Sequence, residues 1–242
     1  MAYHNSVVLC LSGGILKGEN RVFDEKKINR IVTELVSVAS CTQLVVVIGG
    51  GNIARGRDLV GRFNLDPKLA DDVGIMASIL NAYMLGVLLS ERHIPNVVVS
   101  RHNVGELIPL FRQPSAEYIL SILRSKKMVI VGGGTGKGGV TTDTAAVRLA
   151  HKLRAGIILK GTNVRGIFSA DPASNQNVEF LPTLSCGEFR DRKLNTVLDP
   201  RAIEEMSIPI RVFNILTPGL LLDAIAGRPV GSLLTPTLAL AS

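Results

Sequence analysis

Short runs of β-branched and aliphatic residues alternate with amphipathic segments along the whole chain. Six of these apolar runs are expected to be strands: residues 7–11, 44–48, 96–100, 128–131, 156–160 and 209–215. Continuous apolar runs of this length are typical of parallel strands that are buried on both faces. Between the first two runs, residues 25–40 place apolar side chains at i, i+3, i+4 and i+7, which predicts a helix with one buried face.

Further helices are predicted from periodicity and from end signals. One covers about 70–92, with Asp71 and Asp72 in its first turn, and ends before Pro95. Another follows Thr141-Thr142-Asp143, whose hydroxyl and carboxylate groups can serve simply as caps. Two more are expected to begin at Asp199-Pro200 and Thr217-Pro218, each a capping residue followed by proline, and the last to end at Gly227. This alternation predicts an α/β fold: a single three-layer α/β/α sandwich with an open, mainly parallel sheet over residues 1–242.

The composition narrows the class of protein and of partner. With 46% hydrophobic residues, 242 residues are enough to bury a substantial core. The formal net charge of +7 is compatible with nucleic-acid binding, but Lys and Arg are spread along the chain and only 4% of residues are aromatic. A platform for stacking bases is therefore not expected, and no nucleic-acid partner is predicted. Diffuse positive charge fits an anionic small ligand instead.

Cysteine usage and the N-terminal segment bear on location. Cys10, Cys41 and Cys186 show no CxxC or Cys/His spacing, so neither a zinc site nor a disulfide framework is predicted. A reducing cytoplasm is the expected compartment. The first ten residues lack the features of a signal peptide, and the apolar runs are too short to span a bilayer, so no membrane association is expected.

Three glycine-rich turns each follow an apolar run directly. They are Ser12-Gly13-Gly14, Gly49-Gly50-Gly51-Asn52 and residues 132–136. A turn without side chains lets backbone N–H groups converge on phosphate oxygens, and a following helix N-terminus adds partial positive charge. One such turn can merely tighten a corner between strand and helix. Three at the carboxyl ends of strands predict a ligand with several phosphates along one sheet edge.

Two common phosphate motifs are absent. Residues 132–137 lack the spacing of a Walker A loop, and Lys137 is followed by Gly138 rather than by Ser or Thr. Residues 49–56 lack the G-x-G-x-x-G spacing of a dinucleotide fold, and no acidic residue ends the following strand. Neither a P-loop protein nor a Rossmann dehydrogenase is predicted.

A different set of motifs extends over nearly the whole chain. In order, they are LSGGIL at 11–16, VIGGGNIARG at 47–56, DDVGIMASILNAY at 71–83, TGKGGVTTDTAA at 135–146, LKGTNVRGIFSADP at 159–172 and IPIRVFN at 208–214. In these motifs the chain resembles the amino acid kinase family and, within it, the bacterial uridylate (UMP) kinases. The resemblance implies transfer of the ATP γ-phosphoryl group to UMP, with Mg²⁺ accompanying ATP, in a homo-oligomer, expected to be a hexamer, that serves pyrimidine nucleotide synthesis. It also implies an acceptor-nucleotide half over about 1–150 and an ATP-binding half over about 151–242.

The resemblance assigns roles to individual residues, and it assigns none as a metal ligand. The ATP-binding residues it implies are Ser12, Gly13, Gly51, Arg55, Thr162, Phe168 and Asp171. The UMP-binding residues it implies are Gly50, Asp71, Thr135, Gly136, Thr141 and Thr142. The catalytic residues it implies are Lys160, Arg55, Asp143 and Asp199. Such a site works by in-line positioning and positive charge, because an acceptor phosphate is already an anion and needs no general base.

Several positions depart from the family pattern. Cys10 stands where the family has a lysine that contacts the donor phosphates, Gly14 replaces a glutamate, and Arg165 replaces an acidic residue. Lys17 or Lys137 is hypothesised to supply the missing charge. The alternatives to a UMP kinase are a catalytically weakened relative that binds or stores a nucleotide or oxyanion, and a kinase for another small acceptor such as carbamate.

Overall fold

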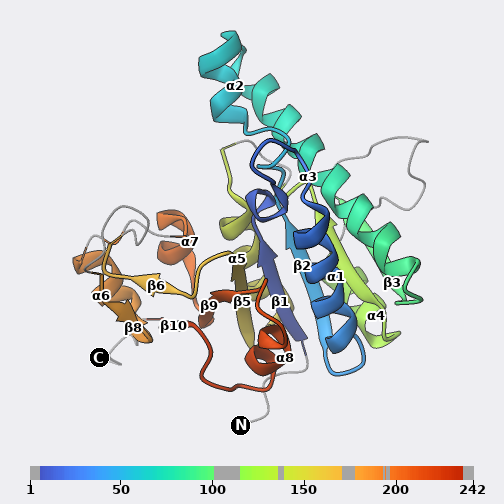
Figure 1. The fold of residues 1–242 in the computed structure, drawn as a ribbon, viewed down its shortest axis with the longest axis vertical. Helices are drawn as coiled ribbons and strands as arrows, with labels where there is room; N and C mark the ends of the chain where they lie inside the picture. Colours follow the sequence, from blue (N-terminus) through green and yellow to red (C-terminus); the bar gives the residue numbers. More distant parts are fainter. Residues whose placement is uncertain are drawn as a thin grey trace.

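An eight-stranded sheet forms the centre of the molecule (Figure 1). The computed structural model describes residues 6–100, 115–135, 139–170, 178–192, 194 and 197–236. Across this described part, the strand order is β3-β4-β2-β1-β5-β9-β10-β8. The first six are parallel, and β10 runs antiparallel to β9. Their bounds are Asn96–Ser100 (β3), Met128–Gly132 (β4), Gln43–Ile48 (β2), Ser6–Leu11 (β1), Ile157–Thr162 (β5), Ile210–Asn214 (β9), Ser232–Thr235 (β10) and Thr183–Ser185 (β8).

All six predicted strands are confirmed, with ends that differ by no more than two residues. The mainly parallel sheet is confirmed as well. Two strands are too short to give an apolar run in the sequence, β6 (Ile167–Phe168) and β7 (Phe180–Leu181), and they pair as a separate antiparallel ribbon.

Helices cover both faces of the sheet and complete the predicted three layers (Figure 1). One core packs the sheet against α1 (Glu25–Val38), α3 (Pro67–Ser90) and α8 (Leu220–Ile225). The other core packs it against α4 (Ala116–Arg124), α5 (Thr142–Leu153), α6 (Cys186–Asp191) and α7 (Pro200–Glu205). Successive side chains of strand β1 point to opposite faces of the sheet and so enter both cores. Leu9 and Leu11 lie in the first core, and Val8 and Cys10 lie in the second. Helix α2 (Gly56–Phe63) buries none of its residues and projects from the body with the start of α3 (Figure 1).

Two predicted helix starts were wrong. Helix α3 begins at Pro67, because the Asp66 carboxylate accepts hydrogen bonds from the amides of Lys68 and Leu69, so Asp71 and Asp72 lie in the second turn. Helix α8 begins at Leu220 rather than after Thr217. Its first amides donate to the buried Glu34 carboxylate of α1, at 2.9 Å from Gly219 and 3.2 Å from Leu221. The cap therefore comes from another helix, which a local motif cannot reveal.

Helix α3 is long and apolar enough to cross a membrane by length and composition alone. Core helices of soluble proteins meet the same test. Here Ile79, Leu85 and Leu89 are buried in the core against the sheet, and Ala77 is buried beside Gly50. Another side leaves large apolar residues exposed, among them Met76 and Leu80.

Candidate active site

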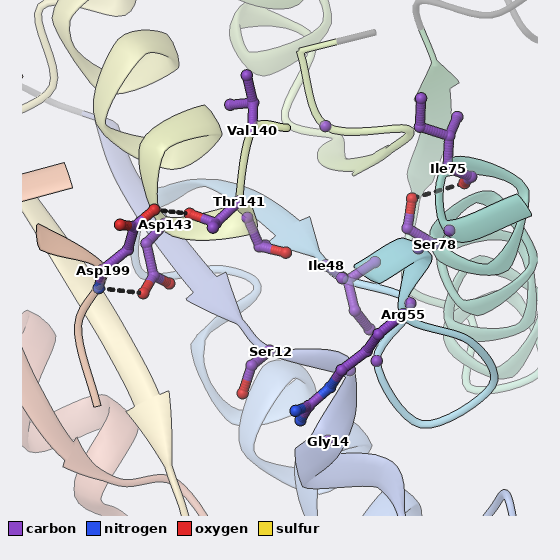
Figure 2. Close-up of a pocket in the computed structure, with 18 of the residues that line it drawn as sticks. Ser12, Gly14, Ile48, Arg55, Ile75, Ser78, Val140, Thr141, Asp143 and Asp199 are labelled. Atoms are coloured by element: carbon purple, nitrogen blue, oxygen red, sulfur yellow. Dashed lines mark hydrogen bonds between the residues drawn. The ribbon is translucent and has the colours of Figure 1, made fainter. Parts of the chain in front are cut away.

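A cavity of about 880 Å³ opens at the carboxyl ends of β1, β2, β4 and β5. The three predicted glycine turns line it, together with the first turn of α5, the segment 197–200 and the facing parts of α2 and α3. Strand β1 pairs with β2, the next strand in the chain, on one side and with β5 on the other side. The cavity therefore lies where the strand order of the sheet changes direction. Ligands of open α/β sheets bind at such a point. Figure 2 shows the residues that converge on this cavity.

The first two glycine turns are packed directly against each other. A Cβ atom on Gly13 would lie 2.3 Å from the amide nitrogen of Gly51 and 2.6 Å from the carbonyl oxygen of Gly49. Only glycine allows this approach. Beneath the turns, the buried Asn81 amide donates to the Gly49 carbonyl at 2.7 Å and to the Asn52 side chain at 2.7 Å. The turns are thus held at fixed separation before any ligand arrives.

Arg55 supplies an available positive charge. Its side chain runs from the second glycine turn toward Ser12 and Gly14 (Figure 2), and it passes close over Gly51. Within the described ranges, no carboxylate pairs with this guanidinium and no hydrogen bond is made by it. An arginine held beside convergent backbone amides suits a polyphosphate.

Lys160 is the second cation, and it is almost fully buried at the end of β5, with 3% of its surface exposed. Its ammonium forms an ion pair with the Asp143 carboxylate of α5. The Cys10 thiol donates to the same carboxylate oxygen at 3.2 Å and lies 3.8 Å from the Lys160 Nζ. These three side chains from β1, α5 and β5 form one buried cluster, of which Asp143 and Lys160 line the cavity and Cys10 lies behind them.

The charges in this cluster follow from burial and proximity. Burial raises the pKa of the Cys10 thiol far above its ordinary value, against the opposing attraction of Lys160, so the thiol stays neutral. Burial alone would lower the pKa of the Lys160 ammonium, but the adjacent groups outweigh it and the net direction is upward. Because Cys10 is neutral, the Asp143 carboxylate is the group that holds the positive charge on Lys160. Cys10 is a buried structural residue here, as its position within a strand suggests.

Asp199 connects two helices at the rim. Its carboxylate caps α7 by accepting from the Arg201 amide at 3.1 Å. At the start of α5 it accepts from the Thr141 hydroxyl (Figure 2) and from the Thr144 hydroxyl at 3.1 Å. Its backbone amide donates to Asp143 at 3.1 Å. Asp199 therefore ties the rim to the buried cluster, and the Thr141 hydroxyl caps α5 by accepting from the Thr144 amide at 3.3 Å.

Asp71 faces the cavity from α3. It is partly buried beside Gly56, where a Cβ atom would lie 2.7 Å from its Oδ1. Among the described residues, none donates a hydrogen bond to this carboxylate or pairs with it. Its neighbour Asp72 is exposed and does not line the cavity. A half-buried carboxylate at a cavity wall is suited to accept hydrogen bonds from hydroxyl groups.

The structure gathers most of the predicted site residues in this one cavity. Those that line it are Ser12, Gly13, Gly50, Gly51, Arg55, Asp71, Thr135, Thr141, Thr142, Asp143, Lys160, Thr162 and Asp199. Phe168 does not line it; its ring meets Phe180 edge-on at 5.4 Å in the β6–β7 ribbon. Gly136, Lys137 and Asp171 lie outside the described residues. Lys17 is exposed and is not part of the lining.

Sequence reasoning missed several lining residues. Gly74 and Ser78 lie three and seven residues after Asp71 on α3, so helical periodicity could have placed them on the same face. Ser78 positions the third glycine turn, because its hydroxyl accepts from the Gly133 amide at 2.8 Å. Arg57 lines the cavity two residues after Arg55, and no motif distinguishes it.

Comparisons with known proteins agree with this geometry. A profile of the amino acid kinase family matches residues 5–214. The chloroplastic uridylate kinase PUMPKIN of Arabidopsis thaliana is 35% identical over 96% of this chain and 68% of its own length. The uridylate kinase of Buchnera aphidicola is 33% identical over 94% of both chains. Among solved structures, the UMP kinase of Bacillus anthracis superimposes with a TM-score of 0.88 at 28% identity, covering 97% of both chains.

A more distant match, the uridylate kinase of Archaeoglobus fulgidus, reaches a TM-score of 0.71 at 27% identity over 95% of this chain and 99% of that one. The profile match covers most of the sequence, and the Buchnera relative is matched along nearly its whole length. The chain therefore belongs to the amino acid kinase family.

Proposed function

We propose that this protein is an ATP-dependent uridylate kinase, which transfers the γ-phosphoryl group of Mg²⁺-ATP to UMP and produces UDP and ADP for pyrimidine nucleotide synthesis. The observation that carries the proposal is a single cavity in which three glycine turns, Arg55 and the buried Lys160 face a common volume. Similarity to uridylate kinases along nearly the whole chain supports the choice of substrates.

The two nucleotides divide the cavity between them in this proposal. ATP lies against the C-terminal half, from about residue 151, with its phosphates over the first two glycine turns, and UMP lies against the half up to about 150. The donor-side residues are Ser12, Gly13, Gly51, Arg55 and Thr162, joined by Phe168 and Asp171 at the adenosine. The acceptor-side residues are Gly50, Asp71, Thr135, Gly136, Thr141 and Thr142.

The chemistry requires positioning more than bond-making by the protein. An oxygen of the UMP phosphate bonds to the γ-phosphorus as the bond from that phosphorus to the β,γ-bridging oxygen breaks, and ADP leaves with the electron pair. Arg55 and Lys160 stabilise the charge on the transferring group. Asp143 and Asp199 act as positioning residues, because Asp143 holds Lys160 and Asp199 holds Asp143. Mg²⁺ enters as part of the nucleotide substrate and neutralises the charge on its phosphate oxygens.

A homo-oligomer is part of the proposal, as a hexamer built from paired subunits. Six large apolar residues of α3 are between 42% and 60% exposed and follow one another at spacings of four and three: Leu69, Val73, Met76, Leu80, Tyr83 and Val87. This spacing makes one continuous seam on the helix, suited to pack against the same helix of a second copy. Light scattering should show an oligomer for the wild type and a smaller species for Leu80→Glu.

We also propose that the protein acts in the cytoplasm, without a membrane or nucleic-acid partner. All three cysteines are free, with Cys10 and Cys186 buried and Cys41 exposed. Free thiols are compatible with a reducing compartment.

The test of the proposed activity is a coupled assay of ADP release with Mg²⁺-ATP and a panel of acceptors. UMP should be the preferred acceptor, CMP should be poorer, and carbamate or no acceptor should give background. Equal turnover with carbamate, or ADP release without any acceptor, would show that the protein is not a uridylate kinase. Nucleotide binding without turnover would indicate a binding protein.

A further inference from the structure

Positive charge in the cavity is unevenly available. Among the described lining residues, the cations are Arg55, Arg57 and Lys160. Lys160 is already paired with Asp143, and the buried Cys10 beside this pair is a neutral thiol. The charge that an incoming phosphate meets first therefore comes from the two arginines that flank Gly56.

Arg57 is the second residue of α2 and lies at the mouth of the cavity. Its side chain is 79% exposed, and its nearest carboxylate is that of Asp58, with Nε and Oδ1 3.8 Å apart. An exposed contact of that length adds little stability. The guanidinium is thus an exposed cation beside the cavity, with no strong partner among the residues that the structure describes.

The charges of the described lining residues balance only when Arg57 is included. Three carboxylates also line the described part of the cavity, those of Asp71, Asp143 and Asp199, so they match the three cations in number. Mg²⁺-ATP and UMP bring further negative charge into the same volume. Without Arg57 the described part of the lining would be net negative, which would repel both nucleotides.

We propose that Arg57 is a further phosphate-binding residue of this site, an inference that rests on the proposed kinase function. Its long side chain turns inward from the rim and donates two hydrogen bonds to the phosphate oxygens of a bound nucleotide. Arginine suits this role because its planar group matches two phosphate oxygens at once. The recognised group is a nucleotide phosphate, which either ATP or UMP supplies.

Calorimetric titration distinguishes the two sources without depending on turnover. Wild type, Arg57→Gln and Arg62→Gln are titrated with UMP, uridine, Mg²⁺-ATP and adenosine. Arg62 is the matched control, since it is an exposed arginine on the same helix that does not line the cavity. Arg57→Gln should weaken binding of UMP or of Mg²⁺-ATP by about tenfold or more, because glutamine lacks the charge that strengthens the two hydrogen bonds from the guanidinium.

Binding of uridine and adenosine should stay unchanged in Arg57→Gln, and Arg62→Gln should resemble wild type throughout. The nucleotide that loses affinity identifies whose phosphate Arg57 binds. If Arg57→Gln binds UMP and Mg²⁺-ATP within twofold of wild type, or if Arg62→Gln loses as much affinity, the proposal is wrong. If the wild type itself binds UMP no better than uridine and Mg²⁺-ATP no better than adenosine, the proposed kinase function fails with it.

Discussion

Replacing Lys160 by methionine tests both the contribution of this side chain to stability and its contribution to catalysis. Lys160 is 3% exposed, and the side chain of its partner Asp143 is 11% exposed. Methionine fills a similar volume but leaves the Asp143 carboxylate, among the described residues, with only the Cys10 thiol and the Asp199 amide as donors. Removing one member of a buried ion pair costs about 3–5 kcal/mol of folding free energy. Because Asp143 borders the cavity and water can reach it, we expect the lower end, about 3 kcal/mol.

This loss of folding free energy can be measured as a lower melting temperature. For a domain of this size each kcal/mol lowers the unfolding midpoint by about 2–4 °C, so Lys160→Met should melt about 6–12 °C below wild type. Its rate of UDP formation should fall by about 10²–10³, because the lost charge acts mainly on the transition state. Calorimetric melting and initial rates under saturating nucleotides measure the two effects separately.

The double variant Lys160→Met/Asp143→Asn separates structure from catalysis. Asparagine removes the unpaired charge, and it can accept from the Asp199 amide with its oxygen while its NH2 group faces the Cys10 sulfur, so most of the melting temperature should return. The rate should stay low, because no cation has been restored. A double variant as unstable as Lys160→Met would show that the ion pair is not the source of the loss. A Lys160→Met rate within a few-fold of wild type would show that Lys160 only supports the fold.

Three further predictions follow from single groups. Asp71→Asn should weaken UMP binding by about tenfold, since it replaces one of the two acceptor oxygens with an NH2 donor, which two ribose hydroxyls cannot both satisfy, whereas Asp72→Asn should not; equal calorimetric affinities for both variants would exclude the role. Gly13→Ala should lower stability by about 1–3 kcal/mol in urea titrations and abolish turnover, because its Cβ would lie 2.3 Å from the Gly51 nitrogen; an active variant of normal stability would contradict the packing of the turns. The pKa of Glu205 is lowered to about 2 by hydrogen bonds from two arginine side chains, so its stabilising effect is present above its ordinary value of 4.5 and is lost as pH falls toward 2. The stability difference between wild type and Glu205→Gln should vanish over that acid range, and a difference independent of pH would refute the assignment.

Local sequence patterns were sufficient to predict the strands and helices whose formation is determined mainly by their own residues. The parallel strands were predicted because each is an apolar run buried on both sides, and the starts of α5 and α7 were predicted from Thr141 and Asp199. The start of α3 carried the same signal at Asp66-Pro67, and it was overlooked. Helix α4 could have been found from its Ser115 cap. Helix α2 is harder to find, because it is only eight residues long and contains two glycines, although Leu59, Val60 and Phe63 lie on one side of it.

Most residues of the site could be predicted, but the contacts between them could not. Resemblance placed Lys160 and Asp143 in the site, and only the fold shows that they neutralise each other across 17 positions of sequence. The link from Thr141 to Asp199 spans 58 positions and depends on how α5 and α7 pack. Arg57 was missed because its proximity to the cavity is set by the direction in which α2 leaves the sheet. Contacts between distant elements of this kind leave no periodic pattern in the chain.

The central claim is that a phosphoryl group is transferred from ATP to UMP in the cavity that Lys160 lines. Phosphorus NMR of wild-type protein mixed with Mg²⁺-ATP and UMP observes that transfer directly. The account predicts that UDP and ADP β-phosphate signals grow in equal amounts as the γ-phosphate signal of ATP declines, and that Lys160→Met shows neither change on the same time scale. Growth of inorganic phosphate and ADP without UDP, or unchanged UDP formation by Lys160→Met, would contradict it.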